Sequence, residues 1–449
     1  MKKIYKLILP IFAMLTIVSC ENYTEDINSD PNAFVKASAD LLIGQVQLAL
    51  MQHMGSNNAR YASVFNNQMS GGDRQYLTLN TYSPNRANYN NMWNNAYVDG
   101  ITNAQVIIDA DDSSDLVKGI AQILQGTLYA DMALLYGDVP FTQAIDPVEY
   151  PDPAYDSQAS VVDGGIALIE AGIAKVGGAT IAAGYGGNRL SGGTWAEAGR
   201  TLAARFALAS ADYPKAKQLA TAGIRTKASD LVTQHGNAQY NRNLMYQFVI
   251  DQRQDYLVAT DSHLANLLDG NTPRKLATPK KDLIYDSYFL ADGTPGDPSY
   301  RTLINTNDGG RFSQTSPAPI ATYYENELIL AEVEQRLGND AAALTHLNAV
   351  RAQLAIDYGS DATGFPLSNS SGATLLEEIM EEKYITLVGE LVSYHDLRRT
   401  SNLIGVPNKS GSPAALEYPQ RFLYPQNEVD TNDNVPKPLP TFFQPTTLF

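Results

Sequence analysis

The fold is decided by residues 323–354, which read YYENELILAEVEQRLGNDAAALTHLNAVRAQL. The stretch predicts two helices, Tyr323–Leu337 and Asp340–Leu354, because Gly338-Asn339 between them favours the left-handed conformation that ends a helix. In the second helix, apolar residues recur at a spacing that places them on one face. This face consists of Leu344, Leu347, Val350 and Leu354. The stretch is therefore a helical hairpin of about 34 residues.

Further segments with helical periodicity lie on both sides of this hairpin. Met92–Ala110 and Leu116–Tyr136 precede it, and Gly137 and Pro140 end the second of these helices. Leu375–Arg399, which follows the hairpin, is predicted to be one long helix. Another helix carries an apolar stripe made of Trp195, Ala198, Leu202, Phe206 and Ala209.

Helical hairpins of this length are typical of tetratricopeptide units, and they bury their apolar faces only by stacking on one another. The sequence therefore predicts an all-α fold, a superhelical scaffold of tetratricopeptide-like hairpins. Trp93 and Trp195 lie on apolar helical stripes and are interpreted as core residues. Four long irregular stretches rich in Gly, Pro, Asn and Tyr interrupt the helices, and we expect function to reside there. They are residues 70–89, 179–194, 269–319 and 418–449.

The N-terminus has the pattern of a cleaved bacterial export signal. A basic start is followed by an apolar run that is shorter than the about 20 residues a membrane-spanning helix needs. The run ends in Val18-Ser19-Cys20, which resembles a lipobox, and Cys20 is the only cysteine of the chain. We expect residues 1–19 to be removed, Cys20 to carry lipid, and residues 20–40 to be a flexible tether ahead of a single helical domain over residues 41–449.

Charge and cysteine content exclude some classes of protein. Removal of residues 1–19 takes away three lysines and no acid, so the formal charge changes from -16 to -19. Binding to nucleic acid is not expected, because it needs clustered Lys and Arg. A chain with one cysteine forms no internal disulfide, so its core must hold the exported fold together.

The sequence contains none of the obvious residue patterns of catalytic or cofactor-binding sites. The five histidines include no pair at metal-ligand spacing, so we expect no metal and no cofactor. His395-Asp396 is interpreted as a polar cluster at a helix end, and the glycine-rich stretch 184–189 fails the dinucleotide pattern at Arg189. Glu377-Glu378 and Glu381-Glu382 are interpreted as a solvated helix face. A glycosidase needs two carboxylates about 5–10 Å apart, which the sequence leaves open, but we do not expect an enzyme.

A set of short motifs, in order along nearly the whole chain, resembles the SusD/RagB-like family of outer-membrane nutrient-binding lipoproteins. The motifs are Glu25-Asp26-Ile27-Asn28-Ser29-Asp30-Pro31-Asn32, Met92-Trp93-Asn94-Asn95-Ala96-Tyr97, Leu134-Leu135-Tyr136-Gly137-Asp138-Val139-Pro140-Phe141, Glu325-Asn326-Glu327-Leu328-Ile329-Leu330-Ala331-Glu332, Asp396-Leu397-Arg398-Arg399-Thr400 and Arg421-Phe422-Leu423-Tyr424-Pro425.

The resemblance implies four tetratricopeptide-like units and a loop-rich ligand face. It also implies that the protein captures oligosaccharide at the cell surface and partners a TonB-dependent outer-membrane transporter. The motifs themselves, including Gly137-Asp138 and Arg398-Arg399, are interpreted as helix caps and packing corners.

Candidate ligand residues are aromatic and planar polar side chains in the irregular stretches, since sugars present apolar faces and rings of hydroxyls. The densest group precedes the Trp93 helix and includes Asp73, Arg74, Gln75, Tyr76, Asn80, Tyr82, Arg86 and Tyr89. A second group consists of Tyr300, Arg301, Asn305, Asn307, Arg311 and Phe312, and a third of Tyr185, Asn188 and Arg189. We expect substitution of Tyr76 and Tyr82 by Ala to weaken sugar binding without unfolding the chain.

Three other functions stay open at this stage. The same architecture would serve for peptides, whose carboxylates Arg74 and Arg311 would meet. A glycoside hydrolase would release reducing ends on incubation with polymer. A helical-repeat scaffold would bind only protein, as such repeats often do.

Overall fold

The structure is a computed structural model that describes residues 39–181, 189–276, 283–361, 363–409 and 418–449. Residues 39–449 form one compact unit. The predicted signal segment, Cys20 and nearly all of the predicted tether lie outside the described residues. In the described part, no helix is long and apolar enough to cross a membrane.

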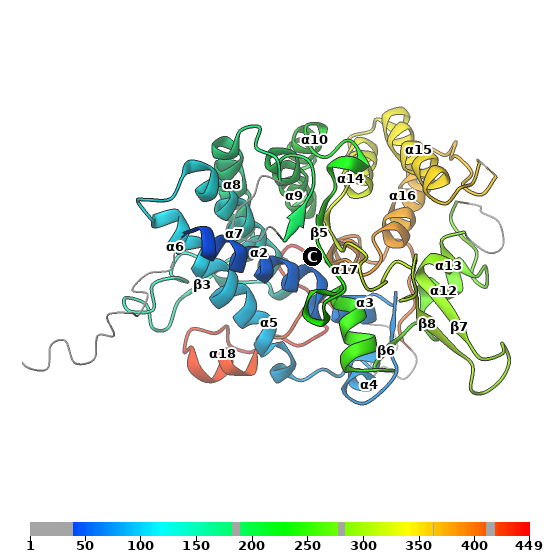
Figure 1. The fold of residues 1–449 in the computed structure, drawn as a ribbon, viewed down its shortest axis with the longest axis horizontal. Coiled ribbons are helices and arrows are strands. Elements are labelled where there is room, and N and C mark those ends of the chain that lie inside the picture. Colours follow the sequence, from blue (N-terminus) through cyan, green and yellow to red (C-terminus); the bar gives the residue numbers. More distant parts are fainter. Residues whose placement is uncertain (1–38, 182–188, 277–282, 362, 410–417) are drawn as a thin grey trace, which may run out of the picture. The chain divides into compact units, whose positions relative to one another are not determined.

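Helices make up most of the regular structure, which confirms the predicted all-α class (Figure 1). The longer helices are α2 (Ala39–Gly55), α3 (Asn57–Phe65), α7 (Asp115–Tyr136), α8 (Gln158–Val176), α9 (Trp195–Ala209), α10 (Tyr213–Thr221), α14 (Tyr323–Arg336), α15 (Asp340–Asp357), α16 (Gly372–Thr386) and α17 (Leu391–Arg399). The shorter ones are α4 (Gln75–Asn80), η1 (Arg86–Tyr89), α5 (Asn90–Asn94), η2 (Asn95–Thr102), α6 (Asn103–Asp109), η3 (Lys227–Ser229), η4 (Gln239–Asn241), α11 (Leu244–Tyr246), η5 (Gln247–Gln252), α12 (His263–Leu268), α13 (Tyr285–Tyr288) and α18 (Gln426–Thr431).

The hairpins stack in sequence order. Helix α7 packs on α8, α8 on α9, α9 on α10, α10 on α14, and α14 on both α15 and α16 (Figure 1). The α7–α8 pair approaches closely because glycines face each other: a Cβ at Gly126 would lie 2.4 Å from the carbonyl oxygen of Gly165. Gly338, at φ +81°, forms the turn between α14 and α15. The hairpin predicted from residues 323–354 is thus confirmed.

The other predicted helices are confirmed with two changes. The segment Met92–Ala110 contains a π-helical turn, η2, between α5 and α6. The prediction of one long helix over Leu375–Arg399 is wrong, because α16 ends at Thr386 and α17 begins at Leu391. Gly389 has φ +75° in this break, a conformation that an α-helix does not contain. Trp93 and Trp195 are buried, as expected.

A buried set of ion pairs joins α14, α16 and α17. Glu332 on α14 accepts from Lys383 at 3.0 Å and from Arg399 at 2.5 Å, and Lys383 also lies 2.9 Å from Asp396. Burial alone would raise the pKa of Glu332, but Arg399 and Lys383 hold that pKa well below its usual range. Removal of one partner would leave an uncompensated buried charge, which costs about 3–5 kcal/mol.

His395 and Asp396 point to different partners, as expected for neighbours on a helix. Asp396 belongs to the ion-pair set, whereas the His395 Nε2 lies 2.9 Å from Asp131 on α7. His53 on α2 lies 3.3 Å from the other oxygen of Asp131. Both histidines are buried and serve to join helices.

The interpretation of Glu377, Glu378, Glu381 and Glu382 as a solvated face is wrong for three of the four residues. Only Glu377 is half-exposed, where it pairs with Lys275 at 3.0 Å. Glu382 is buried and binds Arg351 at 2.9 Å and Arg274 at 3.1 Å. The segment that carries Arg274 covers this face of α16, so tertiary packing overrides the polar pattern.

The family-like motifs form packing corners. Arg398 donates to the carbonyl oxygens of Leu134 and Gln420, each at 2.8 Å, and Arg421 donates to the carbonyl oxygen of Tyr136. Gly137 ends α7 at φ +90°, where a Cβ would lie 2.8 Å from the guanidinium of Arg421. These motifs therefore hold the C-terminal segment against α7.

In the described ranges, four small antiparallel sheets lie among the helices. They pair β1 (Ser70–Gly71) with β6 (Leu257–Val258), β2 (Val139–Pro140) with β3 (Tyr155–Asp156), β5 (Leu231–Thr233) with both β4 (Leu190–Ser191) and β9 (Pro319–Ala321), and β7 (Phe289–Asp292) with β8 (Arg301–Ile304). All four of the long stretches predicted to be irregular contain short helices or strands of their own. These sheets bring distant loops together into the walls of two cavities.

Candidate functional site

Cavity 1, of about 600 Å³, lies where β1, α12 and the β7–β8 hairpin meet the segment after α17. Its walls are rich in amides and hydroxyls, and they carry the phenol ring of Tyr300 and the imidazole ring of His263. The polar neutral lining residues are Asn67, Ser70, Asn80, Thr260, Asn266, Thr272 and Asn408. Two acids and two bases complete the charged lining, namely Asp255, Asp261, Arg301 and Lys409.

Strand β1 forms one wall because Gly71 fits where no other residue would. A Cβ at Gly71 would lie 1.8 Å from the carbonyl oxygen of Tyr76. The Gly71 amide donates to Asn80 Oδ1 at 3.0 Å, which fixes the Asn80 side chain at the cavity wall. Register with β6 places Ser70 opposite Val258 and Gly71 opposite Leu257. Local backbone contact therefore orients the polar group that a ligand would meet.

The start of α12 forms a second wall. Ser262 caps the helix through a hydrogen bond from the Ala265 amide at 3.2 Å. Asn67 accepts from the His263 amide at 3.2 Å and donates to the carbonyl oxygen of Pro407 at 2.9 Å. Asn67 has φ +59°, a conformation that asparagine tolerates better than most residues. This one side chain thus links α12 to the segment that carries Lys409.

Lys409 is buried at the wall of cavity 1. Its Nζ donates to the carbonyl oxygen of Met69 and to Ser70 Oγ, each at 2.7 Å. An ammonium group has three hydrogens, so one stays without a partner among the described residues. Burial lowers the pKa of Lys409 to about 7. The group therefore titrates near neutrality and can act as a hydrogen-bond donor in the cavity.

The remaining charges of cavity 1 are largely compensated. Arg301 donates to Asp255 at 2.7 Å and to Asp292 at 2.8 Å. The Asp255 carboxylate is thus engaged in an ion pair with Arg301. Burial lowers the pKa of His263 to about 4, so this imidazole is neutral at pH 7. Within the described ranges, no group of three or more His, Cys, Asp or Glu side chains could hold a metal ion.

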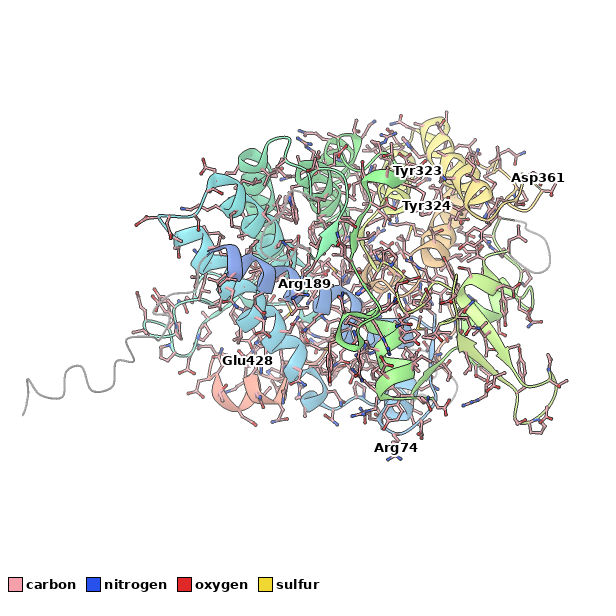
Figure 2. The ribbon with its side chains drawn as sticks, viewed as in Figure 1. Arg74, Arg189, Tyr323, Tyr324, Asp361 and Glu428 are labelled. Atoms are coloured by element: carbon pink, nitrogen blue, oxygen red, sulfur yellow. The ribbon has the colours of Figure 1, made fainter. Side chains whose placement is uncertain are left out.

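Asn80, Tyr300 and Arg301, three of the predicted ligand residues, line cavity 1. Asp73 and Arg74 occupy an exposed turn before α4, where the Arg74 Nε lies 3.6 Å from Asp73 Oδ2. Figure 2 shows Arg74 projecting from the lower edge of the molecule, and neither residue lines the cavity.

Tyr76 and Tyr82 are buried behind the wall of cavity 1 instead of lining it. The Tyr76 hydroxyl accepts from Arg60 at 3.1 Å, and its ring packs 5.1 Å from that of Phe248. The Tyr82 hydroxyl accepts from the Lys409 amide at 3.2 Å. These rings are covered by protein, so they present no open face for a sugar to stack on. The structure gives them the role of supports for the wall.

The other predicted ligand residues lie apart from cavity 1. Arg311 lines a second cavity, described below, and Phe312 is buried with its ring 3.3 Å from the Cβ position of Gly389. Arg74 lies beside Asp73, and Arg311 lies beside Glu390. Each guanidinium, which the peptide alternative assigns to the carboxylate of a ligand, thus already has an acidic neighbour. In the third group, Arg189 is exposed, and Tyr185 and Asn188 lie outside the described residues.

Sequence reasoning missed several residues of cavity 1, above all Lys409, His263 and Asp261. Lys409 lies far along the chain from Asp261 and His263, and none of the three belongs to a recognisable motif. The one available signal was Thr260-Asp261-Ser262, a polar turn that ends in a helix cap. That signal marks a helix start and says nothing about a ligand.

Comparison with known proteins defines the class of this fold and site. Residues 31–425 match the SusD-like family model described as starch-binding and associating with the outer membrane. The chain belongs to this family, as the resemblance in its motifs implied. No curated protein matches the sequence.

Several solved structures share the fold. A SusD/RagB family protein from Bacteroides thetaiotaomicron has a TM-score of 0.66 at 20% identity, over 89% of this chain and 95% of that one. A SusD homologue from Bacteroides fragilis has a TM-score of 0.70 at 16% identity, over 92% and 100%. A chitin-binding SusD homologue from Flavobacterium johnsoniae has a TM-score of 0.68 at 15% identity, over 91% and 97%. At these identities the likeness shows the fold alone.

Proposed function

We propose that the protein binds oligosaccharides in cavity 1, without chemical conversion, at the outer membrane. The observation that carries this proposal is the lining of cavity 1, where amide and hydroxyl groups surround Tyr300. A sugar needs such donors and acceptors for its hydroxyls and an aromatic face for its apolar side. Membership of a family described as starch-binding supports the same class of ligand.

Delivery to a TonB-dependent transporter and anchoring through Cys20 are further parts of this proposal. They rest on the lipobox-like Val18-Ser19-Cys20 and on the family resemblance. Two acyl chains or more would hold the protein stably at a membrane, whereas one chain gives only marginal binding. A Cys20→Ser variant is expected to leave the membrane fraction while it still binds ligand. Retention of that variant in the membrane would contradict the anchor.

Calorimetric titration of the mature chain tests the binding proposal. Two probe series are informative first: maltooligosaccharides, since the family is described as starch-binding, and chitooligosaccharides, since two structural relatives are described as chitin-binding. Heat of binding with at least one oligosaccharide, and no release of reducing ends on long incubation, is the expected result. Absence of binding across a broad panel would contradict glycan binding, and product release would show an enzyme.

Tyr300→Ala is the variant that assigns binding to cavity 1. Loss of the ring is expected to reduce affinity about tenfold, since an aromatic contact of this kind contributes on the order of 1 kcal/mol or more. Tyr240→Ala is the matched control, because Tyr240 is 91% exposed and does not line the cavity. Equal affinity of the Tyr300→Ala variant and the parent would remove cavity 1 from the proposal.

A further inference from the structure

Cavity 2, of about 720 Å³, shares no lining residue with cavity 1. It lies between β5, β9, α13, the start of α14 and the end of α15. Tyr324, at the start of α14 in Figure 2, is one of its walls. A pocket of this size holds a ligand of about the size of a disaccharide or a dipeptide. Nothing in the proposed glycan function uses this cavity.

One buried and one half-buried carboxylate, Glu390 and Asp230, line cavity 2 together with Arg311. Glu390 is 8% exposed, and its Oε1 lies 3.4 Å from Arg311 Nη2. Its Oε2 has no hydrogen-bond partner in the part of the chain that the structure describes. Asp230 lies in the fields of Lys227 and Arg311, and among the described residues its carboxyl accepts a hydrogen bond from the Tyr323 amide at 2.6 Å. Arg311 is the cation that pairs with Glu390 within the described ranges.

The neighbouring bases are occupied elsewhere. Arg205 is held by both oxygens of Glu325, at 2.5 and 2.7 Å. Lys227 is bound to Asp357. As a consequence, burial raises the pKa of Asp230 to about 6 and that of Glu390 to about 8. For both carboxylates burial outweighs the nearby positive charges, which are Lys227 and Arg311 for Asp230 and Arg311 and Arg205 for Glu390.

The wall of cavity 2 already contains an ammonium group, that of Lys227. Lys227 Nζ lies 4.8 Å from the centre of the Tyr324 ring and pairs with Asp357, whose Oδ2 also accepts from the Tyr324 hydroxyl at 2.5 Å. An aromatic face beside a carboxylate is the usual environment for an organic cation. A divalent metal fits less well, because no cluster of three acidic or imidazole ligands occurs in the described residues.

We propose that cavity 2 is a second binding site, which takes a small polar molecule carrying a protonated primary amine, with the amine bound by Glu390 and Asp230. The amine would supply positive charge beyond that of the neighbouring cations, which does not outweigh burial. An amino sugar and a lysine side chain of a short peptide share this chemistry. The site is independent of oligosaccharide capture in cavity 1.

Matched probes that differ in one acetyl group test the proposal. Glucosamine is compared with N-acetylglucosamine, and Nα-acetyl-lysine amide with its Nε-acetylated form, by titration against the mature full-length chain. At least one amine is expected to bind about tenfold more tightly than its acetylated partner, because acetylation removes the charge. Preference within the glucosamine pair identifies an amino sugar as the source, and preference within the lysine pair identifies a peptide. Equal binding of both members in both pairs overturns the proposal.

Glu390→Gln keeps the shape of the side chain and removes its charge. This variant is expected to lose the preference for amines, whereas Asp163→Asn, an exposed acid on α8 outside the cavity, should keep it. If Glu390→Gln does not fold, Asp230→Asn gives the same test, since an amide oxygen can still accept the Tyr323 amide. An unchanged preference in the folded variant overturns the proposal. Amine binding should persist in Tyr300→Ala, so failure of one cavity is distinguishable from failure of the other.

Discussion

Cavities 1 and 2 are similar in size but differ in how their charges are compensated. In cavity 1, Arg301 is bound by two aspartates, and amides and hydroxyls fill most of the remaining wall. In cavity 2, Arg311 faces both Glu390 and Asp230. A compensated polar wall suits a neutral, hydroxyl-rich ligand, whereas an uncompensated carboxylate favours a cation. Because the two cavities have similar volumes, the balance of charge in their walls distinguishes the class of ligand that each would bind.

The two cavities also differ in how they are supported. The wall of cavity 1 rests on buried tyrosines and on a glycine that admits no side chain. Cavity 2 is built on the ends of stacked helices and on the β5–β9 pair. Substitutions behind cavity 1 are therefore expected to affect stability first, and substitutions within cavity 2 to affect charge first.

The largest effect is expected for Tyr76→Ala. The ring is 1% exposed and packs against Tyr61 and Phe248, so its removal leaves a cavity that costs about 3–5 kcal/mol of unfolding free energy. The sequence-based expectation was instead that substitution of Tyr76 would weaken sugar binding without unfolding the chain. Denaturant unfolding measures the loss, with Tyr240→Ala as the exposed control. A fully stable Tyr76→Ala protein that had lost sugar binding would restore the original expectation.

Gly71→Ala is expected to have the next largest effect, and this effect should be confined to cavity 1. The new Cβ would clash with the carbonyl oxygen of Tyr76, so strand β1 must move, at a cost of about 1–3 kcal/mol. Sugar binding at cavity 1 should fall while amine binding at cavity 2 persists, as titration of both ligand classes would show. Gly178→Ala is the control, since nothing lies within 4 Å of its Cβ position. Parallel loss at both cavities in a folded variant would mean that they are coupled.

Glu390→Gln should change how stability depends on pH. Burial raises the pKa of Glu390 to about 8, whereas an unfolded glutamate has a pKa of about 4.3. Between these values the folded protein retains a proton that the unfolded chain releases, so this group makes stability fall as pH rises. Gln removes this loss, and the variant should gain about 2 kcal/mol relative to the parent between pH 5 and pH 6.5. Denaturant unfolding of the variant and the parent at both pH values measures this gain. If the difference in their unfolding free energy were the same at both pH values, Glu390 would be compensated by a positive charge.

The smallest effect is expected for Arg74→Ala. The side chain is 73% exposed and its neighbour Asp73 is half-exposed, so unfolding free energy should change by less than about 0.5 kcal/mol. Because Arg74 does not line cavity 1, affinity for oligosaccharide should change less than about twofold. Titration against the same probe series checks this. A large loss of affinity would extend the ligand face from cavity 1 to the exposed turn.

The local sequence pattern was sufficient to predict the helical scaffold. The spacing of Leu344, Leu347, Val350 and Leu354, the turn at Gly338 and the helix end at Gly137 are each set by residues close together in the chain. Such signals depend on backbone preference and on one apolar face, which a sequence displays directly. The same signals failed at Gly389, where a break needed a positive φ inside an otherwise helical pattern.

Only the tertiary structure decided which polar residues face a cavity. Tyr76, Tyr82 and Tyr300 look alike in sequence, yet the first two are buried supports and the third lines cavity 1. Glu382 and Glu390 are both buried acids, but among the described residues Arg274 and Arg351 bind Glu382, whereas Glu390 pairs with Arg311. Charge compensation depends on partners about 30 to 110 residues away in sequence. The sequence by itself determined a stacked helical scaffold with a lipobox-like start, and long-range packing determined where a ligand would bind and with what charge.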